Sequence, residues 1–162
     1  MKKGVLPWWA MNRPRYAGLF EGKKIIMRQT SDTIRAVIDD NNLYAIDSLL
    51  VLRLKSDCVY SYEYILAALN ADFNDYVYKN ITQESGRVFP QVKPINVRKL
   101  YVPKMSEEGQ TEITNIVADI LNGKIARNEG EEIINNMFNS FFGFSNEELD
   151  AIKTANNIGG TQ

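Results

Sequence analysis

The sequence predicts an α+β fold: a small, mostly antiparallel sheet with a packed helix, followed by a C-terminal helical tail. Two observations predict this class. Three short apolar runs rich in β-forming residues, separated by polar turns, fill residues 23–55. From residue 61 onward the apolar residues recur every three or four positions, which is the period of an amphipathic helix. The change of period places the sheet before the helices, and we expect two parts, residues 1–105 and residues 106–162.

The three expected strands lie between short polar segments. The first, Lys23–Gln29, contains the apolar run Ile25-Ile26-Met27 and is expected to be buried. The second covers Ile34–Ile38, and the third covers Tyr44–Lys55. The Asp39-Asp40-Asn41-Asn42 segment is a turn cluster, because Asp and Asn side chains bond the backbone of the residues that follow them. This succession predicts an antiparallel meander.

One helix and a short closing strand are expected to complete the first part. Residues 61–78 carry apolar side chains at helical spacing and predict one continuous helix. Three prolines interrupt Val88–Met105, so only Ile95–Leu100 can be helical there. The Leu100–Pro103 segment is typical of a short strand.

The tail predicts three helices. Ser106 is a suitable N-cap for the first, and Gly123 can end it. The second is expected from about Glu131 to Phe142. The third begins with Ser145 followed three residues later by Glu148, which is the spacing of a capping box.

Charge is divided unequally along the chain. Residues 1–104 hold 16 Lys/Arg and 10 Asp/Glu, whereas residues 105–162 hold 3 and 10. The first 35 residues have eight Lys/Arg, interleaved with Trp8, Trp9, Tyr16 and Phe20. Clustered Lys and Arg residues with aromatic residues between them are typical of a surface that contacts the phosphates of a nucleic acid. A basic surface that is only solvated and has no partner has the same composition. We expect the acidic tail to be a packing unit that phosphates would repel.

Several classes of chemistry are disfavoured. The chain has no histidine and a single cysteine, Cys58, which we expect to be a small buried apolar residue. No catalytic, cofactor-binding or metal-binding motif occurs, so we expect no enzymatic activity from this chain alone. No apolar run is long enough to span a membrane, and the N-terminus lacks a signal-peptide core, which favours a cytoplasmic protein.

Several segments together resemble one family. Residues 7–55, with their aromatic start, Arg-Pro-Arg step and three strands, resemble the TaqI-like C-terminal specificity domain, the target-recognition domain of adenine-specific DNA methyltransferases and of fused type II restriction-modification enzymes. Residues 64–78 are similar to the leucine-rich helix of that family, with Leu69-Asn70-Ala71 where Leu-Asn-Ser is usual. Residues 86–104 resemble its closing segment, and residues 131–152 are similar to the end of fused restriction-modification methyltransferases.

The resemblance implies a role in sequence-specific recognition of duplex DNA. The Asn-Pro-Pro-Tyr motif and the glycine-rich loop for S-adenosylmethionine, both found in such methyltransferases, do not occur in these 162 residues. The resemblance therefore implies that the methyltransferase catalytic domain, with its S-adenosylmethionine, acts in cis or in trans, and that this chain itself holds no cofactor.

The candidate DNA-contacting residues are basic or polar and lie in the first part of the chain. Arginine can grip guanine through two acceptors, lysine usually holds phosphate, and polar loop residues can read base edges. The candidates are Arg13, Arg15, Lys23, Lys24, Arg28, Ser31, Arg35, Gln83, Ser85, Arg87 and Lys93. The alternative is a protein-interaction module that docks a partner through the helical tail and does not bind DNA.

Overall fold

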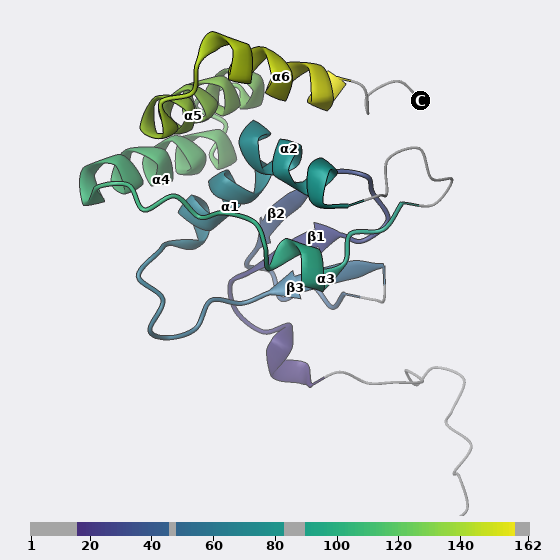
Figure 1. Cartoon of the computed structure of the whole chain (residues 1–162). Coiled ribbons are helices and arrows are strands. Elements are labelled where there is room, and N and C mark those ends of the chain that lie inside the picture. The colour runs from purple at the N-terminus through teal and green to yellow at the C-terminus, as the bar shows by residue number, and fades with distance from the viewer. Residues whose placement is uncertain (1–15, 46–47, 83–89, 158–162) are drawn as a thin grey trace, which may run out of the picture.

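A three-stranded antiparallel sheet lies beneath two layers of helices (Figure 1). The computed structural model describes residues 16–45, 48–82 and 90–157. The first described elements are η1 (Ala17–Leu19), β1 (Lys24–Arg28), β2 (Ala36–Asp39) and β3 (Leu49–Leu52). The predicted α+β class with a C-terminal helical region is confirmed.

The strand order is β2-β1-β3, and the predicted meander is therefore wrong. β1 pairs antiparallel with both neighbours, so it lies in the centre of the sheet. The apolar run of β1, Ile25, Ile26 and Met27, is buried, which is consistent with a strand that has a neighbour on each side. β3 is shorter than predicted, since the Tyr44 ring packs against Phe20 at 4.9 Å between centroids instead of extending the strand.

The helix predicted over residues 61–78 is two helices, α1 (Tyr62–Asn70) and α2 (Asp72–Ile81). They are separated by Ala71, whose backbone is extended. The break follows from Asn70, whose side-chain amide bonds both the N–H and the C=O of Ala36 at 3.0 Å. These two hydrogen bonds hold the end of α1 against β2, so the next helix starts in a new direction.

Residues 94–103 contain the short helix α3 (Pro94–Val97) and no strand. The segment predicted as a closing strand is held instead by one side chain. Asn74 donates to the carbonyl of Tyr101 at 2.7 Å and accepts from its N–H at 3.0 Å. A side-chain amide thus takes the place of a neighbouring strand.

The tail forms the three expected helices, α4 (Glu107–Leu121), α5 (Arg127–Phe142) and α6 (Asn146–Asn157). The N-cap at Ser106 and the capping box of Ser145 and Glu148 are confirmed. α5 begins at Arg127, earlier than predicted. Its first turn contains polar residues and Gly130, so the apolar periodicity used for the prediction does not extend to it. A Cβ atom at Gly130 would lie 2.4 Å from Cδ1 of Ile120, so this position allows close approach of α4 and α5.

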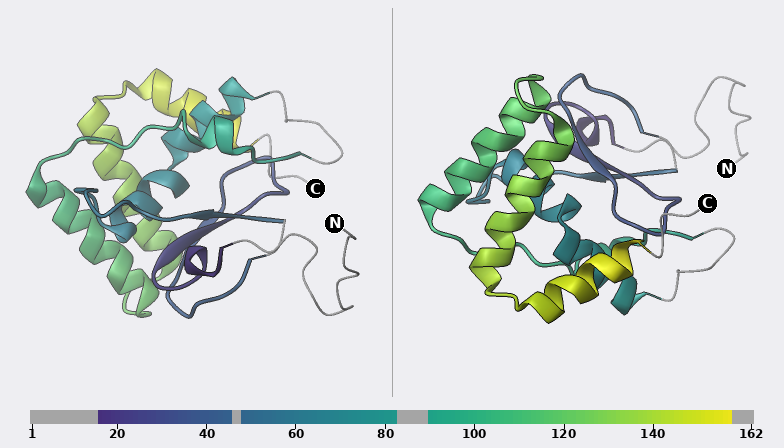
Figure 2. Two further views of the ribbon diagram at one scale, coloured as in Figure 1. Left: turned by 90° about the horizontal axis from the view of Figure 1, so that it is seen from below. Right: turned by 90° about the horizontal axis from the view of Figure 1, so that it is seen from above.

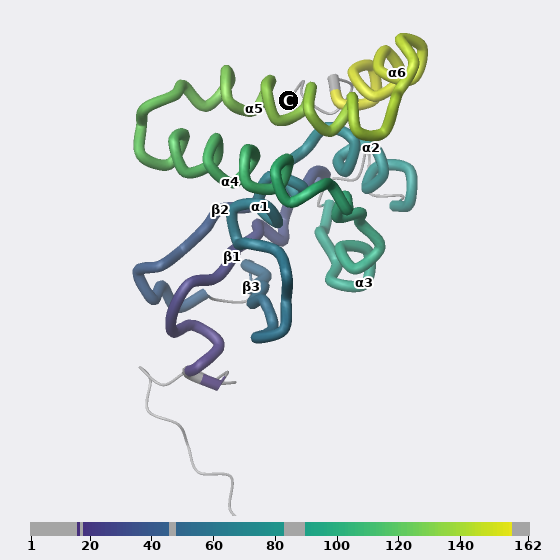
Figure 3. Tube along the Cα trace, turned by 90° about the vertical axis from the view of Figure 1, so that its left-hand side faces the viewer, coloured from purple at the N-terminus to yellow at the C-terminus, as the bar shows by residue number. Residues whose placement is uncertain are grey.

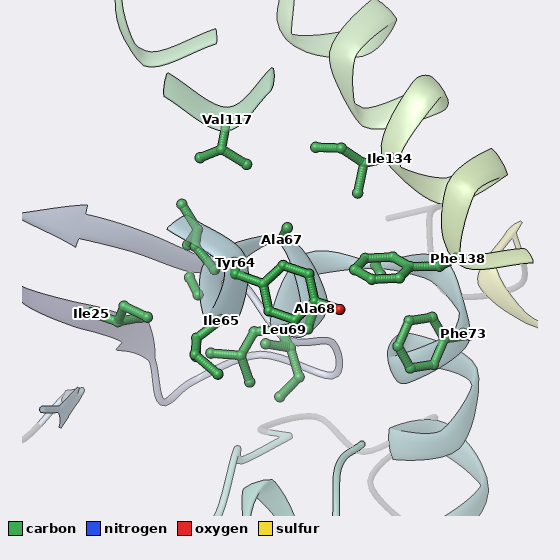
Figure 4. Close-up of a cluster of buried hydrophobic side chains, with 14 of the residues drawn as sticks. Ile25, Tyr64, Ile65, Ala67, Ala68, Leu69, Phe73, Val117, Ile134 and Phe138 are labelled. Carbon is green, nitrogen blue, oxygen red and sulfur yellow. The ribbon is translucent and has the colours of Figure 1, made fainter. Parts of the chain in front are cut away.

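The tail helices bury their apolar stripes on the first part of the chain. α4 packs on α1 and α6 packs on α2, while α5 packs on α4 (Figure 2). Figure 4 shows Phe138 of α5 beside Tyr64 and Phe73, and the ring centroids lie 6.0 Å and 5.4 Å from Phe138 respectively. One apolar core therefore contains residues from both sides of position 105.

Two further predictions concern single features. Cys58 is exposed, so the expectation that it is buried is wrong, and it lies in the loop between β3 and α1. Among the described residues, no helix combines the length and the apolar character needed to cross a membrane.

Candidate nucleic-acid interface

One face of the sheet is turned away from the helices. In β1 the side chains alternate, so Ile25 and Met27 join the main core while Ile26 and Arg28 point to the opposite face. η1 lies on this second side (Figure 3). We call it the outer face of the sheet.

The end of the outer face near η1 is closed by a buried ion pair. Lys24 is fully buried, pairs with the carboxylate of Asp39, its cross-strand neighbour, and donates to the carbonyl of Phe20 at 2.6 Å. Burial by itself would raise the pKa of Asp39. The hydrogen bonds from Lys24 and from the N–H groups of Leu43 and Asn41 outweigh this effect, and the pKa is lowered.

The candidacy of Lys24 is therefore wrong. A side chain with no exposed surface and two internal partners cannot contact DNA. Asp39 keeps its predicted turn role, because its carboxylate accepts the N–H of Asn41 at 3.2 Å and of Leu43 at 3.0 Å.

Lys23 is directed to the other side of the sheet. Its ammonium group pairs with Glu63 of α1 and lies 5.8 Å from the ring centroid of Tyr62. The side chain is 40% exposed, so it remains at the surface, but its charge is balanced within the protein.

Arg28 and Arg35 face each other on the outer face. The β1–β2 register continues through them, with the N–H of Arg28 bonded to the carbonyl of Arg35 at 3.1 Å. Both are exposed, and within the described residues neither has a carboxylate within ion-pair distance. Asp72 and Asp75 of α2 interact electrostatically with Arg35, while Arg28 is its like-charged neighbour across the strands. Like charges directly opposite each other destabilise a sheet, so an anion bound between the two arginines would reduce their repulsion.

A surface hollow of about 510 Å³ lies at this pair. Its apolar lining comes from all three strands: Ile26, Val37 and Leu49. Polar groups are supplied by Thr30 and Ser48, and three arginines complete the lining: Arg28, Arg35 and Arg127. The hollow therefore combines apolar side chains with guanidinium groups, which are strong hydrogen-bond donors to phosphate and guanine.

The loop after β1 lies beside the segment that leads into α3. The N–H of Val92 donates to the carbonyl of Gln29 at 2.7 Å, and Thr30 forms a β-bridge with Gln91. Ser31 is half-buried, and its hydroxyl accepts the N–H of Thr33 at 3.3 Å. Lys93, the half-buried N-cap residue of α3, follows directly. Two candidate segments that are far apart in sequence are thus adjacent.

The other candidates lie outside the described residues. They are Arg13, Arg15, Gln83, Ser85 and Arg87. Sequence reasoning missed Arg127, because it belongs to a tail of opposite net charge, and only the folded structure shows that it lines the hollow.

Comparison with protein families gives one match. The family of the TaqI-like C-terminal specificity domain matches residues 6–102, which is more than half of the chain and includes β1–β3 and α1–α3. The chain belongs to this family. Its members serve DNA recognition in restriction-modification enzymes and are not catalytic. No curated protein matches this TaqI-like chain, and the helices α4–α6 lie beyond the matched segment.

Proposed function

We propose that this chain reads a short duplex DNA sequence for an adenine-specific DNA methyltransferase of a type II restriction-modification system. Membership of the TaqI-like family supports the recognition role. The observation that carries the proposal is the hollow on the outer face, where Arg28 and Arg35 stand opposite each other beside apolar strand residues.

The chemistry of the pair suits DNA. A guanidinium group can donate two parallel hydrogen bonds to O6 and N7 of guanine, or bind one phosphate bidentately. Arg28 and Arg35 lie opposite each other at one end of the β1–β2 pair in the three-stranded sheet, so the two guanidinium groups are presented side by side. One arginine on a base and the other on phosphate would give both position and sequence preference.

Catalysis is assigned to a separate catalytic domain, in cis or in trans. Extrusion of the adenine from the duplex and methyl transfer need a base pocket and an S-adenosylmethionine site. Neither of the motifs that supply them occurs in this sequence. On this proposal the chain selects the site, and the catalytic domain modifies it.

The proposal is tested by fluorescence anisotropy with random-sequence duplex DNA at 50 and 200 mM salt, about the range in which phosphate contacts dominate. The wild-type chain should bind weakly, with a dissociation constant of about 10⁻⁴ to 10⁻⁶ M near physiological salt, and more tightly at low salt. Arg28→Ala and Arg35→Ala should each weaken binding and reduce the salt slope by about one unit if the lost contact is to phosphate.

Arg98→Ala is the matched control. Arg98 is also an exposed arginine, but it follows α3 and does not line the hollow. It should leave the salt slope unchanged. Absence of salt-dependent DNA binding in the wild-type chain would contradict the proposal and favour the alternative of a protein-interaction module.

A further inference from the structure

We infer that Arg127, at the start of α5, binds one phosphate of the DNA backbone together with Arg28 and Arg35. The inference rests on the proposed function and names the chemical group bound in the hollow. It also gives the helical tail, outside the matched family segment, a direct part in holding DNA. The sequence alone had suggested the opposite, because the tail is acidic.

Arg127 lines two hollows together with residues of the sheet. It lines the hollow with Arg28 and Arg35, and it lines a second, smaller pocket of about 150 Å³ in which Val37 and Ile38 of β2 meet Glu131 of α5. Figure 3 shows the turn between α4 and α5 on the side of the molecule where β2 forms the sheet edge. Ala36, Val37 and Arg127 line both hollows, so the start of α5 lies beside the edge strand β2.

The start of α5 has features that favour an anion. Its N-cap residue is Ala126, which has no side chain able to accept from the first-turn N–H groups. Those N–H groups point outward from the helix start and carry the positive end of the helix dipole. A cation at the first helical position is unfavourable on its own, yet Arg127 occupies it. A bound phosphate would satisfy the uncapped N–H groups and the arginine together.

Arg127 keeps donors available for such a ligand. Its Nε donates to Glu131 at 2.7 Å, while the side chain stays 65% exposed. Within the described residues, no hydrogen bond from its terminal amino groups is present. An exposed Arg–Glu pair one helical turn apart is weak, so a phosphate can compete for the guanidinium group. Carboxylates also lie near these arginines: Glu131 pairs with Arg127, Glu129 lies in the first turn of α5, and Asp72 and Asp75 of α2 interact electrostatically with Arg35.

Two matched pairs of variants test the inference in the anisotropy assay with the full chain. Arg127→Ala should weaken binding about tenfold, as expected for one charge-assisted hydrogen bond, and reduce the salt slope by about one unit. Lys124→Ala is its control, because it removes an equal charge and an exposed ion pair, with Asp119, in the same turn. It should change affinity by less than about twofold, since charges without a DNA contact are screened.

Glu131→Gln and Glu132→Gln form the second pair. Both remove one negative charge from α5, but only Glu131 bonds Arg127. Glu131→Gln should tighten binding more than Glu132→Gln does, because it releases Arg127 for the phosphate. A purely structural role for the Arg127–Glu131 pair predicts that Arg127→Ala and Glu131→Gln shift affinity in the same direction.

The outcomes separate the inference from the proposed function. If the wild-type chain shows no salt-dependent DNA binding, both fail. If the wild type binds but Arg127→Ala behaves like Lys124→Ala, or Glu131→Gln weakens binding, only the role of Arg127 is overturned. Thermal melting of each variant confirms that it is folded, and the Glu131 pair decides the question if Arg127→Ala does not fold.

Discussion

Replacing Lys24 with methionine isolates the energetics of the closed end of the outer face. The change removes the charged partner of Asp39, whose side chain is buried. Leaving one member of a buried ion pair without its partner costs about 3–5 kcal/mol, so the free energy of unfolding should fall by about that amount at neutral pH. Urea denaturation followed by circular dichroism measures it.

The pH dependence gives a second readout with a defined sign. In the wild type the pKa of Asp39 is lowered, so its contribution is present above the ordinary carboxyl pKa of about 3.9 and is lost as pH falls through the folded-state pKa. In Lys24→Met, burial opposes ionisation with less compensation, so the pKa of Asp39 should rise. The deficit relative to wild type should therefore shrink as pH falls toward about 4.

Two controls make the result decisive. Lys23→Met breaks a partly exposed ion pair with Glu63 and should cost less than about 1 kcal/mol. The double variant Lys24→Met/Asp39→Asn removes both charges, keeps an oxygen acceptor for the N–H groups of Asn41 and Leu43, and should recover much of the loss. A loss below about 1 kcal/mol for Lys24→Met, or a deficit that does not change with pH, would refute the reasoning.

Three further changes probe the packing of the tail on the body. Phe138→Ala should lower the free energy of unfolding by about 3–5 kcal/mol in urea denaturation, because the ring is fully buried; a loss under about 1 kcal/mol would show that the tail does not share the core. Gly130→Ala should cost about 1–3 kcal/mol by overpacking against Ile120, and an unchanged melting temperature would contradict the close approach of α4 and α5. Ser61→Ala should lower the free energy of unfolding by about 1 kcal/mol, because it removes the N-cap hydrogen bond of α1 at 3.0 Å and the hydrogen bond with Thr114 of α4 at 2.9 Å. Thr114→Val keeps the N-cap and should lower it by less.

Features set by local sequence were predictable. The capping box at Ser145 and the N-cap at Ser106 depend on residues three positions apart, and both were found as predicted. The strand at Ile25–Met27 followed from its apolar run. These elements are determined by the propensity and spacing of neighbouring residues.

Features set by distant contacts were not predictable. The break at Ala71 depends on Asn70 bonding a strand that precedes it by 34 positions. The central place of β1 depends on its pairing with two strands that come later in the chain, and the burial of Lys24 depends on Asp39, which lies opposite it. In the candidate site, Arg28 and Arg35 could be nominated from the charge pattern, whereas Arg127 could be nominated only after the structure showed that it lines the same hollow.

The core shared across position 105 limits how this recognition module can be exchanged between enzymes. Tyr64 contacts Phe138 of α5 with its ring and donates its hydroxyl to the carbonyl of Pro103 at 2.9 Å, so one side chain joins both halves. A chimera cut after the matched family segment would transfer β1–β3 without the helices that cover α1 and α2. Recombination that moves a DNA specificity from one protein to another should therefore carry α4–α6 along with the sheet, as a single inherited unit.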